Sequence, residues 1–149
     1  IELSLFDNGI ELNDKKITSE VCAHHLWFTD KDYIELGSKI KWNPAIKSKN
    51  DRDALWQALK EDKIDIIASD HAPHTIEEKN NKYLSCPSGG PMIQHTILSL
   101  LQKCKKYGVS YEKIVEKIAH NPATIFKVNN RDSLVTWVGV LVSINTMSA

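Results

Sequence analysis

The chain has 149 residues, of which 42% are hydrophobic and 26% charged, a composition typical of a globular domain large enough to bury a core. Nineteen basic residues balance nineteen acidic ones, which argues against a surface built for nucleic acid or an anionic membrane and favours a small-molecule site. No stretch approaches the ~20 apolar residues of a membrane span. The three cysteines form neither a CxxC pair nor a disulfide framework, so we expect a cytoplasmic protein.

The first half of the chain predicts one strand and two helices. Residues 16–22 are rich in β-branched side chains, which favours a strand. Thr29, with an acid three residues later, predicts the start of a helix that Gly37 ends. A second helix is predicted over residues 51–62, with Asn50 as its cap. Its expected apolar face consists of Ala54, Leu55, Ala58 and Leu59.

An apolar strand predicted over residues 64–68 leads directly into Asp70, His71 and His74. In a barrel of alternating strands and helices, polar residues just past the C-terminal end of a strand reach the substrate. A carboxylate at that place can ligate a metal, move a proton, or do both. The simpler alternative is that Asp70 caps the next segment, and the two histidines and the fixed turn at Pro73 weigh against it.

Three helices are predicted in the remaining part of the chain. They cover residues 92–107, residues 110–120 and a short segment that begins with Asn121 as cap. The resulting alternation of strands and helices is typical of a parallel sheet. Residues 132–149 fit this pattern less well.

Two further groups of residues follow the first predicted strand or lie on it. Neighbouring side chains of a regular element diverge, so we expect His24 and His25 not to face one metal together. One structural and one exposed histidine is then at least as good an interpretation as ligation. Glu20 and Cys22 share one side of the strand, where they either line a site or simply pack.

Asn43 and the loop at Ser88 and Gly89 are candidates for ligand binding. Asn43 precedes Pro44, which restricts its backbone to extended conformations and suits its amide to a carboxylate or amide ligand, although many such pairs are only turns. Ser88 and Gly89 offer backbone N–H groups for close approach to a ligand; taken alone, this is merely a flexible loop.

Taken together, these motifs resemble the dihydroorotase family of the amidohydrolase superfamily. Segment 20–26 (EVCAHHL) is similar to the family's Glu-Val-x-Pro-His-His-Leu, with Ala23 where proline is usual. Segment 41–47 (KWNPAIK) resembles Lys-x-Asn-Pro-Pro-Leu-Arg, and segment 69–75 (SDHAPHT), followed by Glu-Glu-Lys, matches that family's motif. Two shorter matches complete the series, at 87–91 (PSGGP) and 120–123 (HNPA).

The resemblance implies an α/β fold, the C-terminal part of a (β/α)8 TIM-type barrel of the metal-dependent amidohydrolase type. Residues 1–131 would form this part, with residues 132–149 as an atypical tail. The implied activity is the zinc-dependent interconversion of dihydroorotate and N-carbamoyl-aspartate in pyrimidine biosynthesis. By this analogy Asp70 is catalytic, ligating zinc and moving the proton. The implied substrate-binding residues are Asn43, His74, Ser88 and Gly89.

The family's other metal ligands, a His-x-His pair, a carboxylated lysine or aspartate and two more histidines, find no counterpart in this comparison. A complete barrel needs ~250 residues, so we expect an incomplete piece that alone is inactive, marginally folded and unable to retain the one or two zinc ions of the complete enzyme.

Two other functions remain open. One is a related cyclic amidohydrolase, such as an allantoinase or hydantoinase. The other is a non-catalytic dihydroorotase-like subunit that scaffolds aspartate carbamoyltransferase. The expected partner is a small-molecule substrate, with no nucleic acid or membrane. A homo-oligomer or an association with aspartate carbamoyltransferase is left open.

Overall fold

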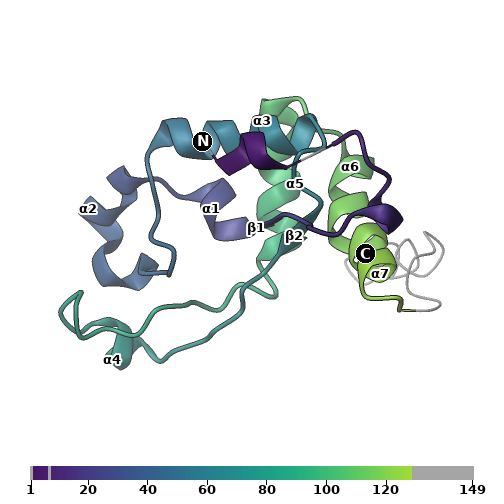
Figure 1. Cartoon of the computed structure of the whole chain (residues 1–149). Helices are drawn as coiled ribbons and strands as arrows, with labels where there is room; N and C mark the ends of the chain where they lie inside the picture. The colour runs from purple at the N-terminus through teal and green to yellow at the C-terminus, as the bar shows by residue number, and fades with distance from the viewer. Residues whose placement is uncertain (1, 7, 129–149) are drawn as a thin grey trace, which may run out of the picture.

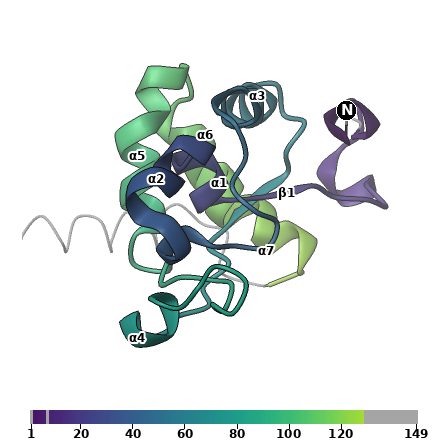
Figure 2. The ribbon, with the colours of Figure 1, turned by 90° about the vertical axis from the view of Figure 1, so that its left-hand side faces the viewer.

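Two short parallel strands lie among the helices of this chain (Figure 1, Figure 2). The computed structural model describes residues 2–6 and 8–128, so the predicted tail 132–149 lies outside the described residues. The strands are β1, Glu20–Cys22, and β2, Ile66–Ala68. The helices are α1 Ala23–Trp27, α2 Tyr33–Leu36, α3 Lys49–Lys60, α4 Ile76–Lys79, α5 Thr96–Tyr107, α6 Tyr111–Val115 and α7 Asn121–Ile125. Short 3-10 segments cover Glu2–Leu5, Leu12–Asp14, Asp30–Asp32 and Gly37–Ile40, and a π-helical segment, η5, covers Glu116–His120.

The two strands pair in parallel, with Val21 opposite Ile67 and Cys22 opposite Ala68. Val21 is buried and Glu20 is exposed, as the alternation of a half-buried strand requires. Both strands were predicted, but each is shorter than its apolar pattern because only three residues of each find a partner strand in the described part of the chain. The parallel pairing confirms the expected α/β class.

A buried carboxylate joins the beginnings of the two strands. Asp65 accepts hydrogen bonds from the Lys15 ammonium at 2.6 Å and from the Ser19 backbone N–H at 2.8 Å. The Lys15 and Asp65 side chains are only 6% and 5% exposed. Lys15 and Ser19 therefore replace the water that the Asp65 charge would otherwise need, and their bonds tie the segment before β1 to the start of β2.

Helix α3 begins two residues earlier than predicted. The Ser48 hydroxyl accepts a hydrogen bond from the Asp51 backbone N–H, and the Asp51 carboxylate accepts one from the Ser48 backbone N–H at 3.0 Å. This is a complete capping box, so Asn50, the predicted cap, lies inside the first turn. The buried face also differs: Trp56 joins Ala58 and Leu59, while Ala54 is exposed.

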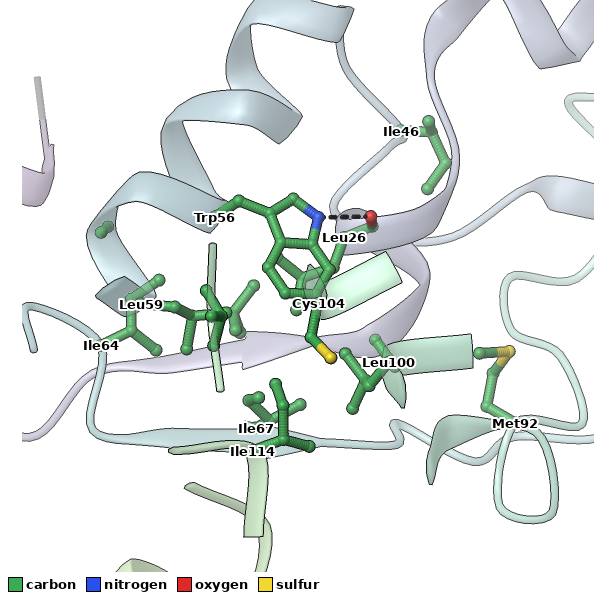
Figure 3. Close-up of a cluster of buried hydrophobic side chains, with 14 of the residues drawn as sticks. Leu26, Ile46, Trp56, Leu59, Ile64, Ile67, Met92, Leu100, Cys104 and Ile114 are labelled. Carbon is green, nitrogen blue, oxygen red and sulfur yellow. Dashed lines mark hydrogen bonds between the residues drawn. The ribbon is translucent and has the colours of Figure 1, made fainter. Parts of the chain in front are cut away.

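The hydrophobic core lies where α1, α3 and α5 pack together beside the strands (Figure 3). The Trp56 indole N–H donates to the Leu26 carbonyl at 2.9 Å, so its polar atom is satisfied inside the core. Its ring stacks on Tyr107 of α5, with centroids 4.8 Å apart. The core side chains labelled in the close-up are Leu26, Ile46, Trp56, Leu59, Ile64, Ile67, Met92, Leu100, Cys104 and Ile114.

The helix ends agree with the sequence in part. Thr29 forms the predicted capping box, and Gly37 and Gly108 end their helices with φ of 53° and 68°, the left-handed region that glycine tolerates. Asn121 was predicted as a cap, but α6, η5 and α7 run on without a break, and the Asn121 amide instead donates to the Asp65 carbonyl at 2.7 Å. Within the described residues no helix has both the length and the apolarity to cross a membrane.

Candidate active site

Side chains capable of catalysis follow both strands at the same edge of the sheet. His24 lies in α1, directly after β1, and Asp70 follows β2. The Asp70 Oδ2 atom is 4.0 Å from His24 Nε2. The His24 side chain is fully buried, whereas that of Asp70 is 47% exposed. The parallel sheet thus places an accessible carboxylate against a buried imidazole, although 46 residues separate them in the sequence.

Cys22 and both histidines form a cluster with the spacing of metal ligands. The ligand atoms of Cys22, His24 and His25 all lie within 4.8 Å of one another. The expectation that the two histidines diverge was wrong, because the chain leaves strand geometry after Cys22 and enters α1 at Ala23. The side-chain alternation of a strand then no longer applies. Thiolate and imidazole are ligands that zinc prefers.

The surroundings of His24 fit a bound cation. Burial, and secondarily His25, lower the pKa of His24 to about 3, so the ring is neutral and its nitrogen lone pair is available. Neither ring nitrogen has a hydrogen-bond partner in the described residues. Buried polar atoms are almost always satisfied, so an imidazole without a hydrogen-bond partner, beside a carboxylate and a thiol, has the donor chemistry to fit a metal ion.

The surroundings of Cys22 and His25 differ from those of His24. Burial raises the pKa of the Cys22 thiol to about 12, and the charges of Asp70 and Glu20 act in the same direction. A thiolate at this position therefore needs a cation to stabilise it. The His25 Nε2 atom is 2.9 Å from the Pro44 carbonyl oxygen, and burial lowers the pKa of this ring as well.

The contact between His25 and Pro44 brings the predicted Asn43 segment to the cluster. Asn43 itself is exposed. Trp42, immediately before it, is buried and stacks on the His24 ring. The amide of Asn43 is therefore carried on a backbone that is held on both sides by the residues of the cluster.

His74 and the Ser88–Gly89 loop also lie together. The His74 Nε2 atom is 3.0 Å from the Ser88 carbonyl oxygen. The backbone N–H of Gly89 was expected to be available to a ligand, but it donates to the Lys41 carbonyl at 3.0 Å. Gly89 has φ of 118°, and a Cβ there would stand 2.6 Å from the Ala72 carbonyl oxygen, so this residue must be glycine for the loop to pack.

His71 has a role in the fold of this loop. Its Nδ1 accepts a hydrogen bond from the Ile93 backbone N–H at 3.1 Å. Its backbone forms a parallel bridge with Gly90. His71 thus joins the segment after Asp70 to the loop that contains Ser88.

Sequence reasoning named Asp70 as a candidate and left His24 open between a structural and a ligating role. The Glu-Val-Cys-Ala-His-His-Leu match was the available signal, since it placed Cys22 and His24 at the end of a strand. The sequence match does not show which strand pairs with β1. Only the parallel alignment of β1 with β2 shows that His24 lies beside Asp70.

The chain is similar in sequence to proteins named dihydroorotase. It is 35% identical over 114 residues to that of Clostridioides difficile and 40% identical over 121 residues to that of Endomicrobium trichonymphae. These alignments cover 76% and 80% of this chain but only 27% and 28% of the two relatives. The chain therefore spans little more than a quarter of the length of the curated relatives it matches. No protein-family model matches it.

Solved structures of a hydantoinase and a dihydroorotase share the fold. L-Hydantoinase (dihydropyrimidinase) from Arthrobacter aurescens aligns with a TM-score of 0.79 at 23% identity, over 89% of this chain and 30% of that one. Dihydroorotase from Saccharomyces cerevisiae, solved with 5-fluoroorotic acid, aligns with a TM-score of 0.71 at 22% identity, over 83% of this chain and 33% of that one. The chain thus shares the fold of part of these two enzymes, as the resemblance implied.

Proposed function

We propose that this chain, a relative of the dihydroorotases over most of its length, forms one side of a zinc-dependent active site that interconverts dihydroorotate and N-carbamoyl-aspartate. The observation that carries the proposal is the approach of Asp70 to His24 across the ends of two parallel strands. The identity of 35–40% to proteins named dihydroorotase supports this substrate over other cyclic amides.

Asp70 is the residue that would hold the metal by the resemblance, and His24, with Cys22 and His25 beside it, lies close enough to add further donor atoms. They combine the nitrogen, oxygen and sulfur ligands that occur in zinc sites. When bound, zinc lowers the pKa of a coordinated water to near ~7 and polarises the amide carbonyl. One of the two unpartnered nitrogens of His24 would then have a partner.

Asp70 would move the proton. In the hydrolytic direction a water adds its oxygen to the ring carbonyl carbon and gives up a proton to the Asp70 carboxylate. The same proton passes to the ring nitrogen as the carbon–nitrogen bond breaks. The new carboxylic acid group releases the second proton of the water to solvent, and N-carbamoyl-aspartate leaves. Cyclisation follows these steps in reverse. A carboxylate that is half exposed at a strand end can reach both atoms.

Asn43, His74, Ser88 and Gly89 would bind the substrate. Asn43 and Ser88 are exposed, so their amide and hydroxyl groups are free to meet the substrate's carboxylate and ring amides. His74 and Gly89 would act through the loop that they hold, in addition to any direct contact.

We also propose that the 149 residues alone do not turn over dihydroorotate. The Asp70 side chain is 47% exposed, so the candidate site is open to solvent on that side, whereas catalysis requires a closed, preorganised site. Detectable hydrolysis by the purified 149-residue chain with stoichiometric zinc would contradict this.

The test uses the full-length protein and an Asp70→Asn variant. Asparagine tolerates the left-handed backbone of Asp70, whose φ is 46°, so the substitution removes the charge without straining the chain. We expect kcat/KM for dihydroorotate to fall by a factor of about 10²–10⁴, while Glu77→Gln, an exposed carboxylate on α4, has no effect.

Metal content provides a second measurement. His24→Phe keeps a ring against Trp42 and removes both nitrogens, so bound zinc should fall while circular dichroism is unchanged. Full activity of Asp70→Asn, or faster turnover of a hydantoin than of dihydroorotate by the wild-type protein, would overturn the proposal. The second result would favour the hydantoinases that share this fold.

A further inference from the structure

Lys79, the last residue of α4, is a buried lysine with an unusual set of partners. Its residue surface is only 6% exposed, although lysine is rarely buried. Its ammonium donates to the carbonyls of Lys41 at 3.2 Å, Pro87 at 3.0 Å and Gly89 at 2.8 Å. An ammonium has three N–H donors and no acceptor, so these three carbonyls use all of its hydrogen-bonding capacity.

The three carbonyls belong to the two segments that would bind the substrate. Lys41 lies two residues before Asn43, and Pro87 and Gly89 flank Ser88 on both sides. The two segments also touch directly through the hydrogen bond from the Gly89 N–H to the Lys41 carbonyl. Lys79 thus sits at the point where the Asn43 segment and the Ser88 loop meet.

Helix α4 holds the same loop from its other end. Thr75 caps the helix: its hydroxyl accepts from the Glu78 N–H at 3.2 Å, and its own N–H donates to the Glu78 carboxylate at 2.8 Å. His74, directly before this cap, contacts the Ser88 carbonyl. Three consecutive carbonyls, of Pro87, Ser88 and Gly89, are therefore all engaged by side chains at the two ends of α4, which lies on the long connection between β2 and α5 (Figure 1).

Burying the Lys79 ammonium costs desolvation free energy, which indicates that the residue has a functional role. Lys79 has no carboxylate partner among the described residues, so its charge is balanced by carbonyl dipoles and by the face of Trp42, whose ring centroid is 5.9 Å away. Burial accordingly lowers the pKa of the Lys79 ammonium. A methionine or leucine would fill this space more cheaply, but would take the ammonium away from three carbonyl oxygens. The Lys41 and Pro87 oxygens would keep the Gly89 N–H and the Cys86 thiol as donors, whereas the Gly89 oxygen has no other donor among the described residues.

We propose that Lys79 is a positioning residue for substrate binding: it fixes the spacing between Asn43 and Ser88 and keeps the loop carbonyls away from the anionic substrate. Without its ammonium, the oxygens of Pro87 and Gly89 would be free to turn toward the substrate carboxylate, which they repel. The proposal deepens the proposed function, on which it rests, by assigning a residue that acts on the substrate only through the backbone.

The experiment compares Lys79→Met with wild type in the full-length, zinc-loaded protein, with Lys82→Met as the matched control at an exposed lysine three residues away. We expect KM for dihydroorotate to rise by about tenfold or more in Lys79→Met, with kcat and zinc content close to wild type. The lost interaction would weaken binding of the substrate and of the transition state equally. Lys82→Met should leave both constants unchanged.

Hydrogen exchange of the Gly89 amide gives a readout that needs no substrate. This N–H is bonded to the Lys41 carbonyl, so its protection should fall in Lys79→Met and persist in Lys82→Met. If Lys79→Met does not fold, Lys79→Arg replaces it. A planar guanidinium cannot direct three donors from one nitrogen, so a smaller rise in KM with unchanged kcat is expected.

The outcomes separate the two proposals. A wild-type protein that does not act on dihydroorotate overturns the proposed function, and the exchange measurement still tests the role of Lys79. Unchanged KM and unchanged Gly89 protection overturn the role of Lys79 and leave the proposed function standing. A rise in KM together with a fall in both kcat and zinc content would show a general structural role, which also overturns the positioning role.

Discussion

The imidazole of His24 lies flat against the indole of Trp42, with ring centroids 4.4 Å apart and 10° between the ring planes. Phe28 stacks on the same indole at 5.8 Å. On the edge of the indole lies Gly90, where a Cβ would stand 2.6 Å from Trp42 Cζ2. The orientation of the His24 ring, and hence of its nitrogens, therefore depends on a glycine in the loop that follows Ser88.

Replacing Gly90 with alanine should disturb the metal site as well as the fold. The new methyl group must push Trp42 away, which costs about 1–3 kcal/mol in a packed core and tilts the His24 ring. We expect a lower melting temperature and a weaker zinc affinity. Gly37→Ala is the control, since it has φ of 53° but nothing within 4 Å of a Cβ, and it should cost stability alone. Unchanged zinc affinity in Gly90→Ala would disprove the link.

Removing the Asp65 carboxylate should destabilise the protein strongly. Asp65→Ala leaves the Lys15 ammonium buried without its partner, which typically costs about 3–5 kcal/mol. Urea unfolding of the full-length protein measures this. Lys49→Gln, which breaks an exposed pair with Asp53, should cost no more than ~0.5 kcal/mol. Adding Lys15→Met to Asp65→Ala should recover part of the loss, and the absence of any recovery would contradict this account.

Ser48 and Asn50 offer a direct comparison of the observed and predicted caps of α3. Ser48→Ala removes the side-chain oxygen that accepts from the Asp51 N–H and should cost about 1 kcal/mol. Asn50→Ala lies in the exposed first turn and should be neutral or slightly stabilising, because alanine has the higher helix propensity. Equal losses in the two variants would contradict the assigned cap.

Lys103 should make stability depend on alkaline pH. Its ammonium lies 3.8 Å above the Trp27 ring, and burial, helped by Arg52, lowers its pKa from 10.5 to about 8. Below pH ~8 the folded protein carries the full penalty of this half-buried charge. Between about pH 8 and 10.5 the unfolded chain binds more protons than the folded one, so the contribution of Lys103 to stability increases with pH.

The measurement is the difference in unfolding free energy between wild type and Lys103→Met at several pH values. This difference should shift in favour of wild type from pH 8 to pH 10. Lys105→Met, at an exposed lysine on the same helix, should show no such shift. A difference that stays constant with pH would rule out the lowered pKa of Lys103.

Features that depend on local pattern were predicted well. The apolar run ending at Asp70 marked the strand end because a buried strand and a polar turn are both visible in consecutive residues. The lengths of the strands were not predicted. Ile17 has the β-branched side chain typical of a strand, but it is 75% exposed and lies outside β1. Strand propensity cannot show how long the neighbouring strand is.

The residues that were missed depend on contacts between distant segments. His24 became part of the site only through the alignment of β1 with β2, and Lys79 is buried only because carbonyls from two other loops surround its ammonium. In sequence, Lys79 ends a short polar helix and is indistinguishable from an exposed lysine. Burial of a cation by backbone oxygens leaves no local signature.

The link between Ser19 and Asp65 has a consequence for the other end of the strands. A parallel pair that slips by one residue turns every side chain to the opposite face and shifts one strand along the other by about 3.3 Å. Such a slip would carry Asp70 out of reach of His24 and exchange the environments of Val21 and Cys22. The Ser19–Asp65 contact specifies one alignment from the far end of the sheet. Errors in this alignment would therefore come in whole-residue steps, leaving a folded molecule whose two candidate ligands no longer meet.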